Sequence, residues 1–542
     1  MSIAPLPAPT LVDGSVDASG GAGHSIASYF DAFAPAPAWD DLVAWPPDVF
    51  ALANLVLDHT EAYRFVVAPP RGRRWPVLPD WGARVSGAAV AWCAALDAGE
   101  SDLPPLVRRC FETVTRNRTM PLEQLRRGTG WATIRALLTL HAIADEACAR
   151  IASAGTAAAP RPFEKRAWEL LQRHGSLARL SAARVRIVPK THFSTRGITI
   201  RSLSRYLALC YESVEIRWRS IGPGPAPRRS DHTFLLVPWP LSVSAADFRI
   251  ASAVSLDNMD RDRFGFFEFD PDPLDVELVD SLLAAAVARA GSVDAVVFPE
   301  AALWPDAVDE LEHSLARHGA SVLIAGVRDA PTPGRLGRNY LHFGIRTETG
   351  WHRYEQDKHH RWCLDERQLR QYHLTRSLPP GKLWWEAIDI RERALHVIDA
   401  GRGMTTAPLV CEDLARLDEV ADLVRRIGPD LVVALLLDGP QLATRWPCRY
   451  ASVIADDPGS AVLTLTPLGM AVRSRPPGTR RSRVVAHWID AEAGPREIEL
   501  ARGAAAVLLS ASVRSARRWT ADGRCHEGVP RLVLTDVRQM RA

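Results

Sequence analysis

The sequence predicts an α/β domain in the C-terminal half of the chain, preceded by a mainly α-helical domain. From about residue 47 to residue 230, apolar residues recur at three- and four-residue spacing, which is typical of amphipathic helices. After residue 230, short apolar runs that fit buried strands alternate with helical patterns, which indicates a sheet with helices on its outer faces. At 542 residues the chain is long enough for two or three domains.

In the N-terminal half, residues 1–37 are rich in Ala, Pro, Gly and Ser and are expected to form a disordered leader. Residues 38–220 are predicted to form an α-helical interaction or regulatory domain. Its expected helices cover 49–65, 81–96, 106–115, 131–151 and 198–209. The Pro- and Gly-rich stretch 221–230 has the composition of a linker.

The α/β pattern covers residues 231–512. Strands are expected at 234–238, 294–298, 321–327, 341–346, 351–354, 396–399, 406–410 and 431–437, and helices at 274–290, 311–318 and 418–427. The tail 513–542 is expected to form a C-terminal arm that could reach a neighbouring subunit.

Composition favours a cytoplasmic protein. The eight cysteines are scattered without a CxxC pair, which suits a reducing compartment. The N-terminus lacks the pattern of a signal peptide, and the apolar runs are too short to span a bilayer. The net charge is only +3, but residues 161–230 hold fifteen Lys and Arg against four Glu. This surplus is either a solvated basic surface or a docking face for nucleic acid or an acidic partner.

Three predicted strand ends in the α/β half carry side chains suited to covalent catalysis. Glu300 ends DAVVFPE, Lys358 follows a hairpin in YEQDKHH, and Cys411 ends APLVC. A carboxylate can accept the thiol proton, the sulfur can attack an amide-like carbon, and a compact cation can stabilise the resulting oxyanion. Singly, each residue has a plainer explanation as a helix cap, a surface cation or a small core residue.

A longer series of motifs resembles the nitrilase superfamily of carbon–nitrogen hydrolases over roughly residues 231–512. The series is VVFPE at 296–300, IAG at 324–326, Asn339, the pair Lys358 and His360, Pro380-Gly381, Gly403, CED at 411–413, Arg449 and TPLG at 466–469. The CED sequence is closest in character to the amidase and glutaminase branches. The resemblance implies an αββα sandwich, a homodimer paired sheet to sheet, and no metal or cofactor.

The same resemblance implies the roles of the reactive residues. Glu300 would be the general base, Lys358 the cation that stabilises the oxyanion, and Cys411 the nucleophile that forms a thioester. The backbone N–H of Glu412 would complete the oxyanion site, with His360 on the substrate side.

A second glutamate is expected between the lysine and the cysteine. Glu366, in LDERQL, matches best, while Asp365 and Glu386 remain open. The sequence departs from the family's pattern at Asp357, which could pair with Lys358 and alter its role.

The predicted function is hydrolysis of a non-peptide amide or a nitrile by a Glu-Lys-Cys triad. The alternative is a non-catalytic sensor or scaffold that acts with a partner protein or nucleic acid, in a context that resembles bacterial reverse-transcriptase defence systems. A cluster of potential zinc ligands, His359, His360, Cys363 and His373, lacks a second pair at structural-zinc spacing and is expected to be a polar rim instead.

Overall fold

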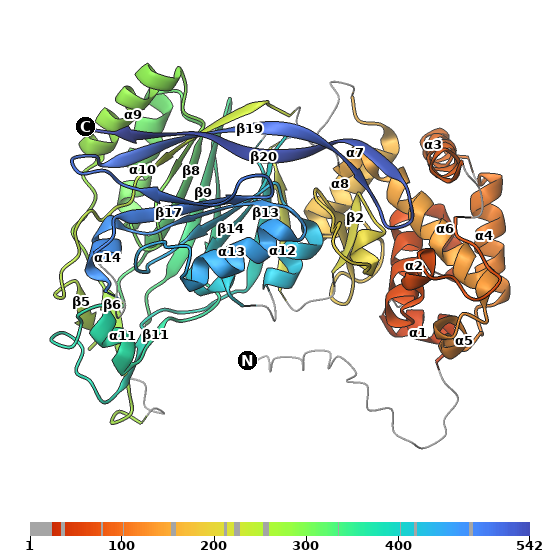
Figure 1. Cartoon of the computed structure of the whole chain (residues 1–542), viewed down its shortest axis with the longest axis horizontal. Coiled ribbons are helices and arrows are strands. Elements are labelled where there is room, and N and C mark those ends of the chain that lie inside the picture. The colour runs from red at the N-terminus through yellow and green to blue at the C-terminus, as the bar shows by residue number, and fades with distance from the viewer. Residues whose placement is uncertain are drawn as a thin grey trace.

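The structure is a computed structural model of the whole chain. It describes residues 24–541 except 34–37, 77–79, 101, 153–158, 211–213, 222–227, 253–259, 334, 401–402, 417–419 and 476–480. Most of the expected leader and linker therefore lies outside the described residues. Figure 1 shows helices from the first third of the chain at one end and the sheets at the other.

The N-terminal helices pack around α6 (Trp131–Ala147), most of whose residues are buried. Helices α2 (Pro46–His59), α3 (Trp81–Ala98) and α4 (Pro105–Arg116) all contact it. The described residues of this part also form α1 (Ile26–Phe33), η1 (Trp39–Ala44), η2 (Ala62–Val66), α5 (Leu122–Arg126), α7 (Ala149–Ala152) and α8 (Pro162–His174).

Helix α1 lies inside the stretch that was expected to be disordered. Ile26 and Phe30, four residues apart on one face of the helix, are buried in the core. The low hydrophobicity of the surrounding Ala, Pro and Gly residues therefore concealed a short amphipathic helix, and the leader prediction was wrong for residues 26–33.

The helix predicted over 198–209 is also wrong. The chain forms a short 3-10 helix, η3 (Ile200–Ser202), and a strand, β2 (Leu207–Cys210), that pairs with β1 (Arg186–Pro189). All four residues of β2 are buried, and periodicity cannot distinguish a short buried strand from a helix. The buried carboxylate of Asp145 accepts the backbone N–H groups of Arg205, Tyr206 and Leu207, which fixes the extended entry to the strand.

Two seven-stranded sheets form the body of the C-terminal part. The first has the order β10-β9-β8-β7-β4-β19-β20 and the second β18-β17-β16-β15-β14-β13-β3. The strands of the first are β4 (Asp231–Leu236), β7 (Ala295–Val297), β8 (Val322–Arg328), β9 (Asn339–Thr347), β10 (Gly350–Asp357), β19 (Ala506–Trp519) and β20 (Cys525–Met540). Those of the second are β3 (Glu215–Ser220), β13 (Ala394–Asp399), β14 (Thr405–Val410), β15 (Leu431–Leu435), β16 (Ala461–Leu465), β17 (Val484–Asp490) and β18 (Gly494–Glu499).

The sheets pack face to face between two layers of helices. Side chains from both inner faces share one core. Helices α9 (Val276–Ala290) and α10 (Pro305–Arg317) cover the first sheet, while α12 (Asp422–Ile427) and α13 (Trp446–Asp456) lie on the other side (Figure 1). Gln356 joins the sheets, because its side chain donates to the carbonyl oxygen of Pro408 and accepts the N–H of His396. This is the four-layer α/β arrangement that the sequence predicted.

The second sheet extends beyond the predicted α/β domain. Its edge strand, β3, lies inside the range predicted as helical and pairs in parallel with β13. On the N-terminal side, α8 contacts β3, and the rings of Trp168 and Trp218 pack edge to face. The helical part is therefore attached to the edge of the second sheet through this strand.

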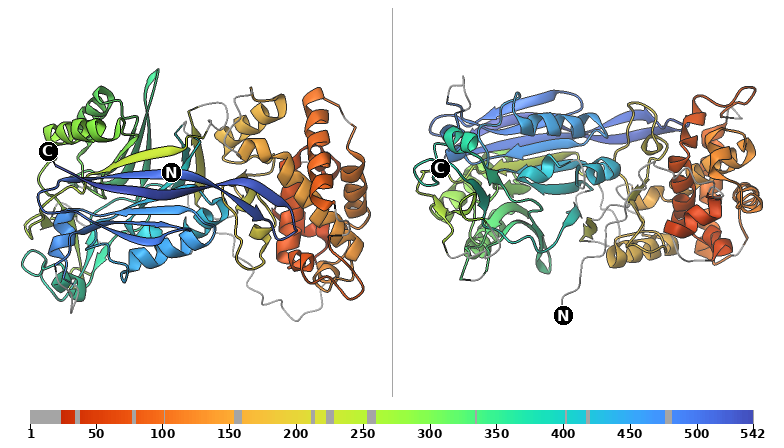
Figure 2. Two further views of the ribbon diagram at one scale, coloured as in Figure 1. Left: turned by 45° about the horizontal axis from the view of Figure 1, so that its top comes forward. Right: turned by 90° about the horizontal axis from the view of Figure 1, so that it is seen from below.

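The tail after residue 512 belongs to the chain's own sheet. Strand β19 pairs with β4 along one edge and with β20 along the other, so the expected arm toward a neighbour is instead a long internal hairpin. Figure 2 shows this hairpin running from the sheets to the helical part. At its tip, Arg524 forms ion pairs with Asp145 and Glu146 of α6.

A smaller four-stranded sheet lies beyond the carboxyl ends of the central strands. It comprises β5 (Phe248–Ile250), β6 (Phe264–Phe269), β11 (Cys363–Leu364) and β12 (Leu383–Glu386), with α11 (Glu366–Gln371) beside it. Its aromatic core includes Ala301 and Leu437, each close to the end of a central strand. The smaller sheet therefore forms a wall over those strand ends.

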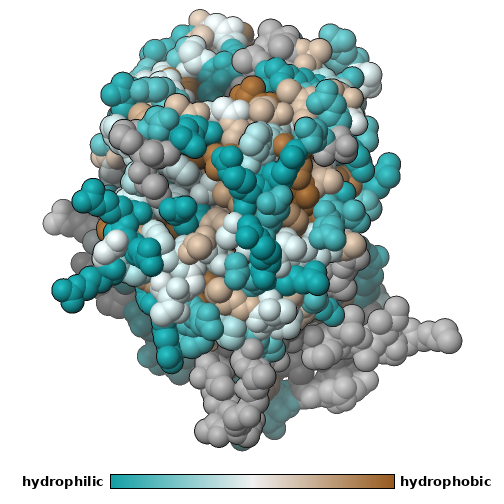
Figure 3. Space-filling view, turned by 90° about the vertical axis from the view of Figure 1, so that its right-hand side faces the viewer, coloured by the Kyte–Doolittle hydropathy of each residue, from teal (hydrophilic) through white to brown (hydrophobic). Residues whose placement is uncertain are grey.

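Among the described residues, no helix combines the length and apolar character needed to cross a bilayer. The helical end of the molecule presents a largely hydrophilic surface with small apolar areas (Figure 3). Large apolar side chains exposed in the helical part include Val67 and Val90.

Candidate active site

The three residues predicted to be reactive follow strands of both large sheets. Glu300 comes after β7, Lys358 directly after β10, and Cys411 directly after β14. All three are buried, with relative exposures of 0%, 0% and 4%. Two side chains that carry charge at neutral pH are thus removed from water next to a thiol, an arrangement that costs free energy unless the charges are paired.

The charges are paired within a compact cluster. The Lys358 ammonium lies 2.7 Å from Oε1 of Glu300 and 2.6 Å from Oε2 of Glu386. The side-chain amide of Asn339, the first residue of β9, donates to both carboxylates at 2.8 and 2.6 Å. One ammonium and one amide therefore hold two carboxylates in fixed positions.

Cys411 lies on a strained corner. Its φ of 48° is in the left-handed region that non-glycine residues rarely adopt. Ala301, directly after Glu300, has a φ of 52°. Strain of this kind persists where the surrounding structure holds it, and it is concentrated at functional sites. Here both strained corners adjoin a predicted catalytic residue.

Gly326, in the predicted IAG motif, permits the close packing of the Glu300 corner. A Cβ atom at this position would lie 2.4 Å from Cα of Glu300 and 2.5 Å from the carbonyl oxygen of Pro299. Any larger residue would push that corner away from β8. The glycine therefore helps to set the position of the Glu300 carboxylate.

The electrostatics favour an ionisable base beside a protonated thiol. Burial raises the pKa of Glu300, although Lys358 and a polar contact with the Cys411 thiol lower it, and the net direction is upward. Burial and the nearby Glu300 carboxylate raise the pKa of Cys411 well above its usual value, against the opposing effect of Lys358. The thiol therefore needs a base to remove its proton, and Oε2 of Glu300 is buried without a hydrogen-bond partner.

Lys358 stays charged in this setting. Burial lowers its pKa, but the carboxylates of Glu300 and Glu386 raise it, and the net shift is well above the usual value for lysine. Asp357, which could have neutralised the lysine, instead forms an ion pair with Arg338 at 2.7 Å. Lys358 is thus a permanent cation at the site.

Asp413 connects the lysine loop to the cysteine corner. Its carboxylate accepts the backbone N–H of His359 at 3.2 Å and lies 2.9 Å from Nδ1 of His360. His360, predicted to be on the substrate side, is therefore held through its ring by Asp413. The side chain of Glu412 pairs with Arg416, which leaves only its backbone N–H for the predicted oxyanion role.

The structure does not bring the predicted second glutamate into the cluster. Glu366 lies in α11, where it pairs with Arg370, and its side chain is 49% exposed. Glu386, one of the two open alternatives, contacts Lys358 instead. A usable signal was present in the sequence, because Glu386 ends the apolar run LWW as Glu300 ends VVFP, whereas Glu366 begins a polar helix.

A contact to Cys411 from the neighbouring strand was not predicted from the sequence. The backbone N–H of Leu437, just beyond β15, donates to the sulfur of Cys411 and lowers its pKa. Such backbone contacts leave no signature in residue type. They depend on the parallel pairing of β14 with β15.

Within the described residues, no group of three or more His, Cys, Asp or Glu side chains is placed to hold a metal ion. His359 and His360 face different partners, since Nε2 of His359 lies 3.0 Å from the carbonyl oxygen of Ala394. These histidines thus contribute to the loop's structure.

The basic stretch 161–230 is matched by carboxylates from other parts of the chain. Arg179 pairs with buried Asp48, Arg201 with Asp457, and Arg228 with buried Asp430. In the same stretch, Arg184 and Arg186 donate to the backbone carbonyl oxygens of Ala32 and Val214. These arginines therefore make contacts within the molecule, and the pair of Arg201 and Asp457 joins the helical part to the end of α13.

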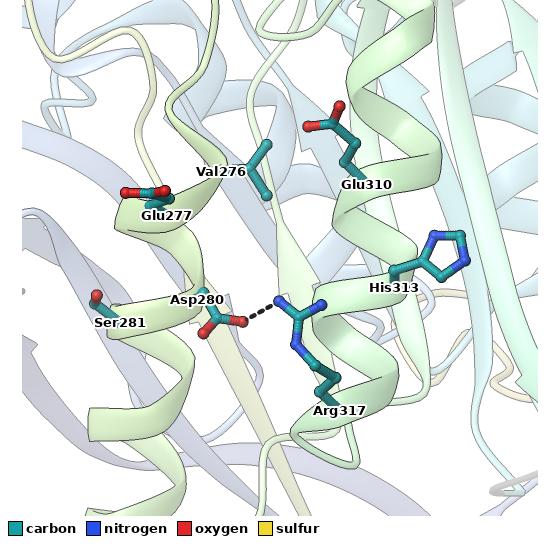
Figure 4. Close-up of a pocket in the computed structure, with 7 residues that line it drawn as sticks. All are labelled: Val276, Glu277, Asp280, Ser281, Glu310, His313 and Arg317. Atoms are coloured by element: carbon teal, nitrogen blue, oxygen red, sulfur yellow. Dashed lines mark hydrogen bonds and ion pairs between the residues drawn. The ribbon is translucent and has the colours of Figure 1, made fainter.

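A groove between α9 and α10 lies on the outer helical layer (Figure 4). Asp280 and Arg317 face each other across it at 2.6 Å, and Ser314 also donates to Asp280. The groove contains none of the buried cluster. The Asp280–Arg317 pair joins the two helices that line it, as expected of a contact between neighbouring helices.

No protein-family model matches this chain, and no curated protein matches its sequence. Many solved structures resemble part of it, including the following three. Nit3 of Saccharomyces cerevisiae, a member of branch 10 of the nitrilase superfamily, is 12% identical over 50% of this chain and 87% of its own length (TM-score 0.32). XC1258 from Xanthomonas campestris, a CN-hydrolase superfamily protein, is 17% identical over 52% and 90% (TM-score 0.31).

The third is a carbon–nitrogen hydrolase from Helicobacter pylori G27, which is 10% identical over 50% of this chain and 86% of its own length (TM-score 0.29). These scores are too low to assign an activity. We therefore base the interpretation of the site on its own geometry.

Proposed function

We propose that this chain is a carbon–nitrogen hydrolase of the nitrilase type, which cleaves a non-peptide amide or a nitrile through a thioester on Cys411. The observation that carries the proposal is the buried cluster at the strand ends. A carboxylate with an unpartnered oxygen, a permanently charged ammonium and a thiol on a strained corner lie together, and this set of groups suits attack on an amide carbon.

In the first half of the reaction, Glu300 accepts the proton of the Cys411 thiol as the sulfur attacks the substrate carbon. The negative charge that develops on the substrate oxygen is stabilised by the Lys358 ammonium and by the backbone N–H of Glu412. Glu300 then returns its proton to the departing nitrogen. Ammonia or an amine leaves, and the acyl group remains on the sulfur.

In the second half, a water molecule attacks the thioester while Glu300 accepts its proton. The carboxylic acid is released, and the thiol regains a proton from Glu300. Glu386 acts as a positioning residue, because it holds Lys358 and Asn339 at 2.6 Å without contact to the sulfur. With a nitrile, the sulfur would add to the nitrile carbon in the same way. Hydrolysis to the carboxylic acid would then consume one more water molecule than hydrolysis of an amide.

The test is a panel of simple amides, glutamine and nitriles, with ammonia release measured by a coupled assay. We expect at least one substrate to be hydrolysed, and we expect the Cys411→Ala variant to lose this activity and the acyl adduct found by mass spectrometry. If the folded wild-type protein releases no ammonia and forms no adduct with any compound, the hydrolase proposal fails. The non-catalytic sensor alternative would then replace it.

A further inference from the structure

A second buried ion pair lies just beyond the end of β15. Asp438 lies one residue beyond Leu437, whose N–H contacts the Cys411 sulfur. Its Oδ1 lies 2.6 Å from Nη2 of Arg445 and also accepts a hydrogen bond from the hydroxyl group of Tyr372. The residue is only 5% exposed. A carboxylate so close to the nucleophile is not needed by the proposed reaction.

Continuous contacts link this pair to the catalytic cluster on both sides. The aromatic rings of Tyr372 and Trp362 pack edge to face with their centroids 5.5 Å apart, and the backbone N–H of Trp362 donates to Oε2 of Glu386. On the other side, the backbone leads from Asp438 through Leu437 to the sulfur of Cys411. The contacts therefore form a closed ring that includes both Cys411 and Asp438.

The pair is built into the fold. Thr466 donates its hydroxyl to the carbonyl oxygen of Asp438 at 2.6 Å and accepts the backbone N–H of Asp438 at 3.1 Å. A Cβ atom at Gly439 would lie 2.6 Å from Nη1 of Arg445, so the glycine makes room for the guanidinium. The carboxylate is thus held in place before any ligand arrives.

Two polar atoms of the pair have no hydrogen-bond partner although both are buried. They are Oδ2 of Asp438 and Nε of Arg445. A buried carboxylate oxygen without a donor costs free energy, and native structures usually retain such an atom where something else completes it. The unpartnered acceptor next to the nucleophile therefore points to a donor supplied by the substrate.

The charge balance of the ring indicates what kind of donor fits. The residues that form the ring include three carboxylates, Glu300 and Glu386 paired with Lys358 and Asp438 paired with Arg445, and these two cations. The ring therefore has one excess negative charge when all five groups are ionised. A positively charged donor restores the balance, whereas an anionic acyl chain would add to the excess.

We propose that Asp438 determines substrate specificity by accepting a hydrogen bond from a cationic N–H group on the acyl chain, so that the preferred substrates are amides of amino-substituted acids. This inference rests on the proposed hydrolase function. Tyr372 and Arg445 are positioning residues that hold the carboxylate. The amine is bound while the amide carbon, at the other end of the same acyl chain, lies against Cys411.

The test compares amides of equal length that differ only in charge. The probes are 3-aminopropanamide, 4-aminobutanamide and 5-aminopentanamide, each paired with the isosteric butanamide, pentanamide or hexanamide, with succinamate as the anionic probe. We expect kcat/KM for at least one amino amide to exceed that of its neutral partner by about tenfold or more, since charge-assisted hydrogen bonds are the strong ones. A preference below twofold at every length, or a preference for succinamate, overturns the inference.

Substitutions test whether Asp438 is the residue that gives the preference for amino amides. Asp438→Asn should reduce the ratio of the two kcat/KM values to below about threefold, mainly through KM for the amino amide. Asp280→Asn, which breaks a comparable carboxylate–arginine pair in the groove of Figure 4, should retain the wild-type ratio. If Asp438→Asn does not fold, Tyr372→Phe keeps the carboxylate but removes one of its donors, and an unchanged ratio in that variant would also contradict the proposal.

The outcomes separate this inference from the proposed function. Hydrolysis of the neutral amides without a preference for the amino amides leaves the hydrolase proposal intact and removes the role of Asp438. If none of the probes is hydrolysed, the inference is overturned. Alkylation of Cys411 by chloroacetamide, followed by mass spectrometry, then shows separately whether the thiol is reactive.

Discussion

Compared with each other, two buried clusters of ion pairs contain carboxylates whose pKa values shift in opposite directions. At the strand ends, the pKa of Glu300 is raised because burial outweighs the attraction of Lys358. At the tip of the β19–β20 hairpin, burial also raises the pKa of Asp145. Arg524 and backbone N–H groups lower this pKa by more, so the net direction is downward. Burial alone therefore does not explain why the pKa values of Glu300 and Asp145 shift in opposite directions.

The difference lies in how completely the carboxylates are hydrogen-bonded. Asp145 accepts three backbone N–H groups and an Arg524 N–H, and Arg524 uses all three of its side-chain nitrogens. Glu300 has one oxygen bonded to Lys358 and Asn339 and the other without a partner. A saturated carboxylate holds structure together, whereas an unsaturated one retains the capacity to accept a proton.

The largest effect is expected from removing the cation of the catalytic cluster. Lys358→Met should lower kcat/KM by at least about 10³-fold, because the oxyanion loses its main stabilising charge. It should also lower the free energy of unfolding by about 3–5 kcal/mol, since two carboxylates remain buried without their cation. Urea denaturation and amidase assays measure the two effects.

Exposed Lys165 provides the matched control for this substitution, and Lys165→Met should change stability by less than about 0.5 kcal/mol. Retention of more than a tenth of the wild-type activity in Lys358→Met would show that the lysine does not stabilise the transition state.

Removing the cation of the hairpin cluster should affect stability alone. Arg524→Met should cost about 3–5 kcal/mol by leaving Asp145 and Asp522 buried without their partner. Activity per folded molecule should remain within about twofold, because Arg524 lies far from the strand ends in the fold. The exposed pair of Arg517 and Glu527 is the control, and Arg517→Met should cost less than about 1 kcal/mol.

A loss of activity in Arg524→Met comparable with that in Lys358→Met would mean that the hairpin tip acts on the active site. The two clusters would then not be separate in function.

The two candidate second glutamates give a matched pair of substitutions. Glu386→Gln should lower kcat by about 10- to 100-fold, because it weakens the hold on Lys358 and Asn339. Glu366→Gln, on the surface of α11, should leave kcat within about twofold. If the two variants were equally impaired, or if only Glu366→Gln were impaired, the assignment from the structure would be wrong.

The smallest effect concerns pH. Catalysis needs the ionised form of Glu300, so kcat/KM should fall as pH decreases through a pKa that lies above the ordinary glutamate value of 4.5. The Glu386 carboxylate contributes to raising that pKa. In Glu386→Gln the acid limb should therefore move to lower pH, whereas a purely structural role for Glu386 would leave its position unchanged.

The sequence predicted the three reactive residues that the structure brings together. Glu300 and Cys411 each follow an apolar run and Lys358 follows a hairpin, but their roles were implied by the ordered series of motifs and the resemblance it carries. The choice between Glu366 and Glu386 was decided by a tertiary contact with Lys358, although the apolar run before Glu386 already favoured it over Glu366. The role of Asp438 was hidden, because it depends on the pairing of neighbouring strands and on Tyr372 from the smaller sheet.

The alternation of strands and helices predicted a sheet with helices on its outer faces, whereas the packing of two sheets against each other was implied only by the resemblance. The errors concern segments whose structure is set by distant partners. The 198–209 segment is extended because Asp145 captures its backbone, and the tail joins the sheet because β4 offers an edge. The surplus of arginines in 161–230 could not be interpreted without knowing that Asp48, Asp430 and Asp457 lie opposite.

The most direct test of the catalytic assignment compares cysteines within one molecule. Cys525 is exposed, whereas Cys411 is buried with a raised pKa, so exposure alone favours reaction at Cys525. If Glu300 activates the Cys411 thiol, the sulfur of Cys411 should displace chloride from the CH2 carbon of chloroacetamide faster than that of Cys525 does, as measured by time-resolved peptide mass spectrometry. Glu300→Gln should slow only the Cys411 reaction. Faster labelling of Cys525, or equal labelling of Cys411 with and without Glu300, would contradict the account.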